Sequence, residues 1–169
     1  MGKLVFDPEL CTGCRACELA CSFRKDGVFS PTRSRIRVVK MDEEGMDVPV
    51  GCEHCDDAPC ISVCPVGAIK EDPETGAVLI DNGACIVCRL CIPARPFAAI
   101  SHDSISKEVR KCDLCGGKPE CVDWCFTGAI RYVESLEEYR RERRQAIAER
   151  VAYAISEGKR TGVAQWHSA

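Results

Sequence analysis

Residues 11–21 read Cys-Thr-Gly-Cys-Arg-Ala-Cys-Glu-Leu-Ala-Cys. Three cysteines follow one another at intervals of three residues, and a fourth comes four residues after the third. A short loop can direct three neighbouring thiols to one place, but the chain that continues from it carries the fourth thiol away. This stretch therefore predicts a loop with three converging cysteines and a fourth cysteine that serves a different place.

The same arrangement recurs along the chain. The other groups are Cys52, Cys55, Cys60 and Cys64; Cys85, Cys88 and Cys91; and Cys112, Cys115, Cys121 and Cys125. The third group has Arg95 at the position where a fourth cysteine would complete it. Because residues 64–69, 95–100 and 125–130 align as a repeat ending in Ala-Ile, Arg95 is a substitution and not an insertion. Each repeat predicts a short strand, a cysteine loop, a short helix and a further strand.

This spacing is that of bacterial ferredoxins, in which three close cysteines hold one iron–sulfur cubane and the fourth reaches a second cubane. A structural zinc site usually has two Cys-x2-Cys pairs separated by a dozen or more residues. A single tetrahedral ion does not need a triplet plus a further cysteine, so the complete groups indicate iron–sulfur clusters. The odd total of fifteen cysteines disfavours a disulfide framework.

Composition excludes other classes of protein. The 169 residues include only five Phe, two Trp and three Tyr, so an ordinary core would be thin and something besides packing must hold the fold. A net charge of −3 argues against a nucleic-acid partner. The sequence has no nucleophile–base constellation, phosphate loop or dinucleotide fingerprint.

The sequence predicts a cytoplasmic protein with no direct membrane insertion. The first residues do not resemble a signal peptide, and no apolar run reaches the roughly 18 residues that a membrane span requires. Cytoplasmic thiols stay reduced, which favours metal binding over disulfides.

The four groups resemble those of the four-cluster ferredoxin-type electron-transfer subunits of molybdenum and tungsten oxidoreductases, such as dimethyl sulfoxide reductases, formate dehydrogenases and hydrogenases. The resemblance covers residues 1 to about 133. It implies an α+β fold of two nested bacterial ferredoxin-like modules, each with two 4Fe-4S clusters, followed by a C-terminal helix. A small subunit that has lost one ligand also resembles the iron–sulfur subunit of the tungsten benzoyl-coenzyme A reductase of anaerobes.

The resemblance implies three complete ligand sets, which we name A, B and C. Set A is Cys11, Cys14, Cys17 and Cys125; set B is Cys112, Cys115, Cys121 and Cys21; set C is Cys85, Cys88, Cys91 and Cys64. We therefore expect three 4Fe-4S clusters.

The fourth set consists of Cys52, Cys55 and Cys60, with Arg95 in place of the last ligand. A guanidinium has no lone pair to offer a metal. The three cysteines can hold nothing, a three-iron cluster, an atypical cubane, or a zinc ion completed by His54 or Asp57. We expect no cubane here. Since a relay tolerates the loss of an end site better than that of a middle one, we expect this set at an end of the row or beside it.

The predicted organisation is an outer ferredoxin module formed by residues 1–21 and 101–133, a hairpin insertion at 22–51, an inner ferredoxin module at 52–100, and a C-terminal helix and tail at 134–169. The alternation around Arg35-Ile36-Arg37-Val38 and the turn at Asp42–Gly45 predict the hairpin. Ser135 and Glu138 form a capping box for a helix over 135–157, with Gly158 as its stop.

The expected function is that of an iron–sulfur subunit that transforms no substrate itself. It relays electrons between a donor or acceptor protein and a large catalytic subunit with a tungsten or molybdenum cofactor, as in a benzoyl-coenzyme A reductase or aldehyde oxidoreductase type complex. The alternatives are a free-standing polyferredoxin that diffuses between enzymes, and a zinc-stabilised scaffold without redox activity.

Overall fold

The computed structural model describes residues 2–94, 99–104 and 106–161. The chain divides into two compact units, Met1–Glu134 and Ser135–Ala169. All fifteen cysteines belong to the first unit, and the described part of the second unit is one helix.

The first unit is built from short elements. Its helices are α1 (Ala16–Asp26), α2 (Pro59–Ser62) and α3 (Glu120–Asp123), with 3-10 turns η1 (Pro8–Leu10), η2 (Pro31–Arg33) and η3 (Leu114–Gly116). Its strands are β1 (Lys3–Phe6), β2 (Arg37–Met41), β3 (Met46–Val50), β4 (Ile69–Glu71), β5 (Val78–Ile80), β6 (Ile100–His102), β7 (Val109–Lys111) and β8 (Ile130–Val133). This mixture of helices and strands agrees with the expected α+β class.

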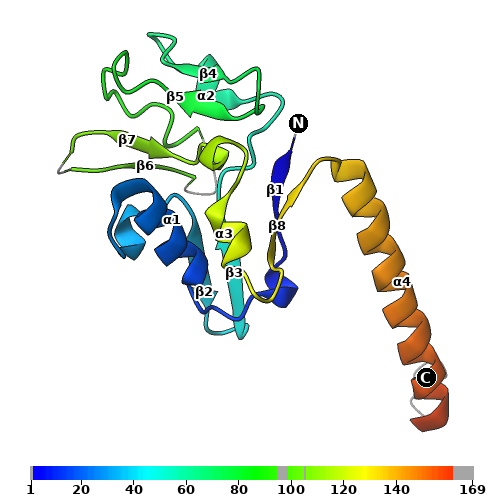
Figure 1. The fold of residues 1–169 in the computed structure, drawn as a ribbon. Coiled ribbons are helices and arrows are strands. Elements are labelled where there is room, and N and C mark those ends of the chain that lie inside the picture. The colour runs from blue at the N-terminus through cyan, green and yellow to red at the C-terminus, as the bar shows by residue number, and fades with distance from the viewer. Residues whose placement is uncertain (1, 95–98, 105, 162–169) are drawn as a thin grey trace. The chain divides into compact units, whose positions relative to one another are not determined.

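Within the described residues, the strands form antiparallel pairs: β1 with β8, β2 with β3, β4 with β5, and β6 with β7. Figure 1 shows β1 and β8 side by side, and Phe6 pairs with Ile130 in their register. The first and last strands of the unit are therefore joined directly.

The predicted strands after the cysteine groups begin at the isoleucines of the Ala-Ile repeats. Ile69, Ile100 and Ile130 begin β4, β6 and β8, and all three side chains are buried. The alanines before them are buried too, which leaves no room for a larger side chain at the start of each strand.

Two buried clusters of side chains make up the core, and both contain cysteines. The first combines Leu4, Cys17, Cys21, Ile36 and Val38 with Ala77, Leu114, Cys121 and Ile130. The second combines Ala58, Cys60, Ile69, Val78, Cys91, Ile100 and Val109. Cysteine side chains thus form part of both cores in a chain that has few aromatic residues.

Helix α1 places two of the cysteines in the first core. It ends at Gly27, which has a φ of 69° and donates its N–H to the Phe23 carbonyl at 2.9 Å. A left-handed residue at this position is favoured as glycine because it carries no Cβ. The buried Glu18 carboxylate accepts the Val38 N–H at 2.7 Å and so fixes α1 against β2.

The predicted hairpin is present as the β2–β3 pair. Its turn closes with a hydrogen bond from the Glu44 N–H to the Met41 carbonyl. Three cations of this region form ion pairs within the chain: Lys25 pairs with Asp113, Arg35 with Asp26, and Lys40 with Asp47. They are therefore engaged in structural ion pairs.

Helix α4 (Leu136–Thr161) forms the second unit. The Ser135 hydroxyl accepts the Glu138 N–H at 3.2 Å, as the predicted capping box requires. The predicted stop at Gly158 is wrong, because the helix continues to Thr161. A glycine inside a helix costs only about 1 kcal/mol relative to alanine, and no proline follows to end it. No helix in the described ranges is long and apolar enough to cross a bilayer.

Candidate cluster-binding sites

All fifteen cysteines lie in the described ranges, and no disulfide joins any two of them. They gather in groups that draw on distant parts of the sequence.

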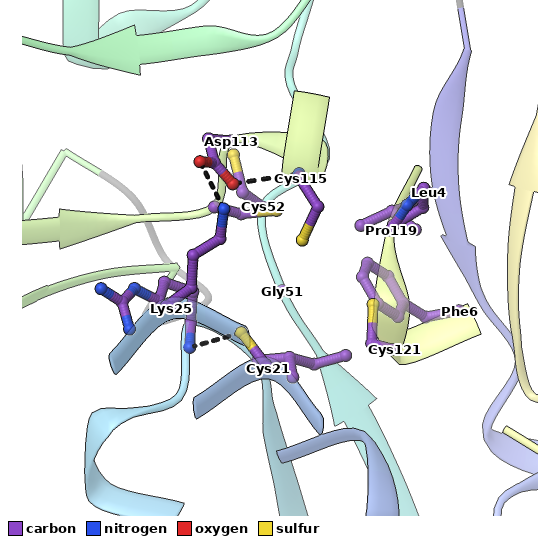
Figure 2. A pocket seen from close by; sticks show the side chains of 13 residues that line it. Leu4, Phe6, Cys21, Lys25, Gly51, Cys52, Asp113, Cys115, Pro119 and Cys121 are labelled. Atoms are coloured by element: carbon purple, nitrogen blue, oxygen red, sulfur yellow. Dashed lines mark hydrogen bonds and ion pairs between the residues drawn. The ribbon is translucent and has the colours of Figure 1, made fainter. Parts of the chain in front are cut away.

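The cysteines of set B line one cavity. Cys21 reaches it from α1, and Cys112, Cys115 and Cys121 come from about ninety residues later in the chain. Figure 2 shows the sulfur atoms of Cys21, Cys115 and Cys121 turned toward a common space, and Leu4, Phe6 and Pro119 also line the cavity. Cys52, a member of the fourth set, lines the same cavity.

The loop after Cys112 is shaped by backbone and carboxylate hydrogen bonds. The Leu114 N–H donates to Cys112 Sγ at 3.4 Å, and the Cys115 N–H donates to Asp113 Oδ1 at 3.0 Å. Lys25 of α1 pairs with the same Asp113 carboxylate at 2.6 Å, as Figure 2 shows. Across the cavity, the Arg35 N–H donates to Cys21 Sγ at 3.3 Å. Both sides of the cavity therefore point amide groups at sulfur.

Burial and mutual repulsion disfavour ionised thiols in this cavity. Burial raises the pKa of Cys112 to about 12, and the nearby Cys52 and Cys21 add to the increase. Burial likewise raises the pKa of Cys121, followed by the effects of Cys112, Cys21 and Cys115. The four thiols of set B are thus close enough to influence one another's ionisation.

The cysteines of set A gather in a second group. Burial raises the pKa of Cys17 to about 12, and the adjacent Glu18 carboxylate, Cys125 and Cys14 raise it further. Burial also raises the pKa of Cys11, with contributions from Asp47, Cys14 and Cys125. Cys125, more than a hundred residues downstream, therefore lies beside Cys11 and Cys17.

The cysteines of set C line a third space. Cys64, Cys85, Cys88 and Cys91 share a cavity with apolar residues that include Ile69, Ile80 and Val109. Although partial burial opposes it, the backbone amides of Val66, Ala68, Ile69 and Gly67 lower the pKa of Cys64. The Ala68 N–H donates to its sulfur at 3.3 Å. These amides therefore stabilise negative charge on the Cys64 sulfur.

Two cysteines of the fourth set lie near cysteines of the other groups. Cys52 lines the cavity of set B, whereas Cys60 packs with Cys91 in the second core. Cys60 also contributes to raising the pKa of Cys91, after burial and the closer Cys85 and Cys88. That this set lies at an end of the row or beside it stays a prediction. Long-range packing of the segment after Val50 fixes the contacts of Cys52 and Cys60, and Arg95 lies outside the described residues.

The His54 ring contacts the backbone of β5 and the buried Lys111. Its ring Nδ1 accepts the Val78 N–H at 2.9 Å and lies 3.4 Å from Lys111 Nζ, while its backbone N–H donates to Cys52 Sγ at 3.4 Å. No three His, Cys, Asp or Glu side chains among the described residues are arranged around a single-ion position.

Lys111 is the site residue that the sequence did not reveal. It is buried, and its ammonium contacts the Val78 carbonyl, the Cys112 carbonyl and His54. A lysine before a cysteine carries no signal of burial, because most lysines are exposed. Only the packing of β7 against β5 places it inside.

These donor sets fit iron–sulfur clusters. Several buried thiols that raise one another's pKa cannot all ionise unless a cation compensates them. Metal binding deprotonates a coordinating thiol outright and so supplies that compensation.

Comparison with known proteins agrees with this chemistry. A family model described as a 4Fe-4S dicluster domain matches residues 44–135, and a 4Fe-4S binding domain matches residues 4–23. The chain belongs to the 4Fe-4S dicluster family. The predictions of an iron–sulfur electron-transfer subunit of oxidoreductases and of several 4Fe-4S clusters are thereby confirmed.

Similar proteins include named subunits of oxidoreductases. The polyferredoxin-like subunit of the aliphatic sulfonate oxidoreductase of Pyrococcus furiosus is 40% identical over 122 residues, covering 72% of this chain and 70% of the relative. The beta subunit of the NADH-dependent phenylglyoxylate dehydrogenase of Aromatoleum evansii is 34% identical, covering 80% of this chain but 31% of the relative. The thiosulfate reductase electron transfer subunit PhsB of Salmonella typhi is 34% identical, covering 76% and 73%.

One similar solved structure is the active-site complex BamBC of benzoyl-coenzyme A reductase in complex with zinc. It has 26% identity and a TM-score of 0.46, with 92% of this chain and 98% of that chain covered.

Proposed function

We propose that this chain relays single electrons between a donor or acceptor protein and a large catalytic oxidoreductase subunit, through clusters held by sets A, B and C. The observation that supports it most directly is the exchange of fourth cysteines. Cys125 lies beside Cys11 and Cys17, while Cys21 shares a cavity with the cysteines of the last group. Two cubanes side by side require such an exchange in ferredoxins.

The nested arrangement of modules is part of this proposal. The first core joins residues near the N-terminus to Leu114, Cys121 and Ile130, and the β1–β8 pair joins the same two regions. Among the described residues, the second core is formed by residues from Ala58 to Val109. Both features support an outer module into which an inner one is inserted.

The residues of the chain bind the clusters and adjust their charge. A 4Fe-4S cluster supplies a one-electron redox couple when bound. Amides that donate to Cys64, Cys112 and Cys21 stabilise negative charge on sulfur, and the apolar walls of the cavities exclude water. Hydrogen bonds to sulfur, burial and net charge are the factors that set cluster potentials in proteins.

The catalytic partner is inferred from the similar proteins. The similar proteins are named as subunits of sulfonate, phenylglyoxylate and thiosulfate enzymes, which supports a large oxidoreductase partner. We propose that it carries tungsten or molybdenum, and that the complex works anaerobically in the cytoplasm. Fifteen cysteines with no disulfide among them fit a reducing compartment.

Anaerobic co-purification from the native host tests the subunit function. We expect the tagged full-length chain to elute with a large protein that contains tungsten or molybdenum by elemental analysis. The untagged strain, processed identically, controls for adventitious carriage of that protein. A chain that elutes alone with its clusters intact would support a diffusing polyferredoxin instead.

A further inference from the structure

The four cysteine loops share one backbone conformation. The residue two positions after the first cysteine of each group has a positive φ: 65° at Gly13, 48° at His54, 56° at Val87 and 54° at Leu114. A left-handed conformation costs a residue with a side chain about 1–2 kcal/mol. Such strain persists where the surroundings require it, and it concentrates at functional sites. The Cys52 loop therefore has the same unusual shape as the three loops with complete ligand sets.

The same residue directs its amide at the first sulfur. The His54 N–H donates to Cys52 Sγ at 3.4 Å, as the Leu114 N–H does to Cys112 Sγ at 3.4 Å. In the first loop, the Gly13 amide hydrogen bonds to Cys11 and opposes the effect of burial on its pKa. An amide aimed at sulfur stabilises a thiolate, so the Cys52 loop retains the feature that serves a bound cluster.

A buried positive charge stands beside this loop. The Lys111 side chain is 9% exposed, and its described contacts are the Val78 and Cys112 carbonyls and the His54 ring, none of which carries a negative charge. Burial of an ammonium is costly unless an anion is close. Thiolates that hold iron and sulfide on the His54 side would supply negative charge near this ammonium, in addition to that of set B.

The positions of Cys52 and Cys60 bear on electron transfer between the other three sets. Cys52 lines the cavity of set B, and Cys60 packs against Cys91 of set C. Electron transfer weakens steeply with distance, so a site that held nothing here would separate set C from sets A and B.

We propose that Cys52, Cys55 and Cys60 hold an iron–sulfur cluster through three thiolates, and that this cluster links the B and C clusters. Its iron nearest the missing cysteine is either absent, as in a three-iron cluster, or bound by a group other than cysteine. Its role as a link rests on the proposed function, whereas its presence does not. This replaces the expectation that the substitution at Arg95 leaves the set without a cluster.

Metal analysis of the anaerobically purified full-length chain tests the proposal. We expect about fifteen or sixteen irons, of which about twelve belong to three cubanes. Cys55→Ala lowers the content to about twelve and removes one component from the electron paramagnetic resonance and Mössbauer spectra. Ser62→Ala, an exposed position of α2 in the same segment, leaves iron and spectra unchanged.

Two results would overturn the proposal. One is a content of about twelve irons in both the native chain and Cys55→Ala; the other is one zinc per chain that disappears in Cys55→Ala. Arg95→Cys provides an independent test, because it adds a possible ligand and removes none. We expect it to add at most about one iron, whereas an empty site would gain about four. An iron content of about four in the native chain would instead refute the three complete ligand sets. Failure of this proposal and failure of the proposed function can therefore be told apart.

Discussion

Gly13 shows how one residue couples a cysteine loop to the rest of the fold. It lies between Cys11 and Cys14 with a φ of 65°, and a Cβ built on it would come within 2.3 Å of the Asp47 carboxylate on β3. A side chain at this position would therefore have to displace the Asp47 carboxylate and would also hold a left-handed conformation. The hairpin thus supports the first cluster loop through a contact that has no local sequence signal.

Gly13→Ala should destabilise the protein through both strain and overlap. We expect a cost of about 3 kcal/mol, which combines a left-handed alanine with an overpacked contact, and a fall of about 8 °C in the temperature at which the clusters are lost. Gly27→Ala is the matched control, because Gly27 has a φ of 69° but a Cβ placed there would meet no other atom within 4 Å. It should cost about 1 kcal/mol. Equal effects of the two substitutions would show that the Asp47 contact is unimportant.

At the scale of elements, the Asp26 carboxylate connects α1 to the segment before β2 and to β7. Asp26 is the last residue of α1, where a negative charge opposes the helix dipole. Arg35, just before β2, pairs with it at 2.8 and 3.3 Å, and Arg110 of β7 lies 3.8 Å away. Burial alone would raise the pKa of Asp26, but the hydrogen bond from Arg35 and the charges of Arg35, Arg110 and Arg33 outweigh it and lower that pKa.

Asp26→Asn should therefore destabilise the protein in a pH-dependent way. Because the folded-state pKa is lowered, the stabilisation by the carboxylate is complete above its unfolded pKa of about 3.9 and is lost as the pH falls through the folded value. At pH 7 we expect a loss of about 2 kcal/mol, or about 6 °C in thermal midpoint. The difference between native and variant midpoints should narrow as the pH is lowered toward about 4 and below.

The exposed Asp42, in the hairpin turn, supplies the comparison. Asp42→Asn should change the stability by no more than about 0.5 kcal/mol at any of these pH values. A midpoint difference for Asp26→Asn that stays constant across the pH range would contradict the role of its charge.

At the scale of the whole molecule, pairing of the two ends of the first unit supports the redox chemistry. β1 pairs with β8, and the same closure brings Cys125 to Cys11 and Cys17 and brings Cys21 to Cys112. In the proposed ligand sets, sets A and B therefore each take cysteines from both ends of the unit. A site of this kind forms only when both ends are folded together, so cluster binding contributes directly to the free energy of folding.

Double substitution tests this exchange of ligands. Cys125→Ala should remove about four irons, and adding Cys11→Ala should remove no more, because both residues serve set A. Adding Cys112→Ala instead should remove about four further irons, since that residue serves set B. Cluster spectra and iron analysis provide the measurement. The opposite pattern, with Cys125 and Cys112 in one site, would reject the exchange, and intact far-ultraviolet circular dichroism of each variant controls for unfolding.

The chemistry and the local structure of this protein can be read from the order of its residues. Spacings such as those of Cys11, Cys14 and Cys17 specify which thiols one loop can bring together, and the turn at Asp42–Gly45 and the cap at Ser135 act within a few residues. These features depend on neighbours in the chain, so they can be identified without knowing how distant segments pack. The confirmed family and cofactor follow from this local information.

The place of the fourth set, and the charges that surround it, depend on long-range packing. Cys52 meets Cys112, Cys60 meets Cys91, and Lys111 becomes buried beside His54 because strands far apart in the sequence pack together. Contacts of this kind leave no periodic pattern in the sequence, since each depends on the arrangement of all the elements at once. For that reason the sequence could identify the degenerate set but not which other groups its cysteines contact.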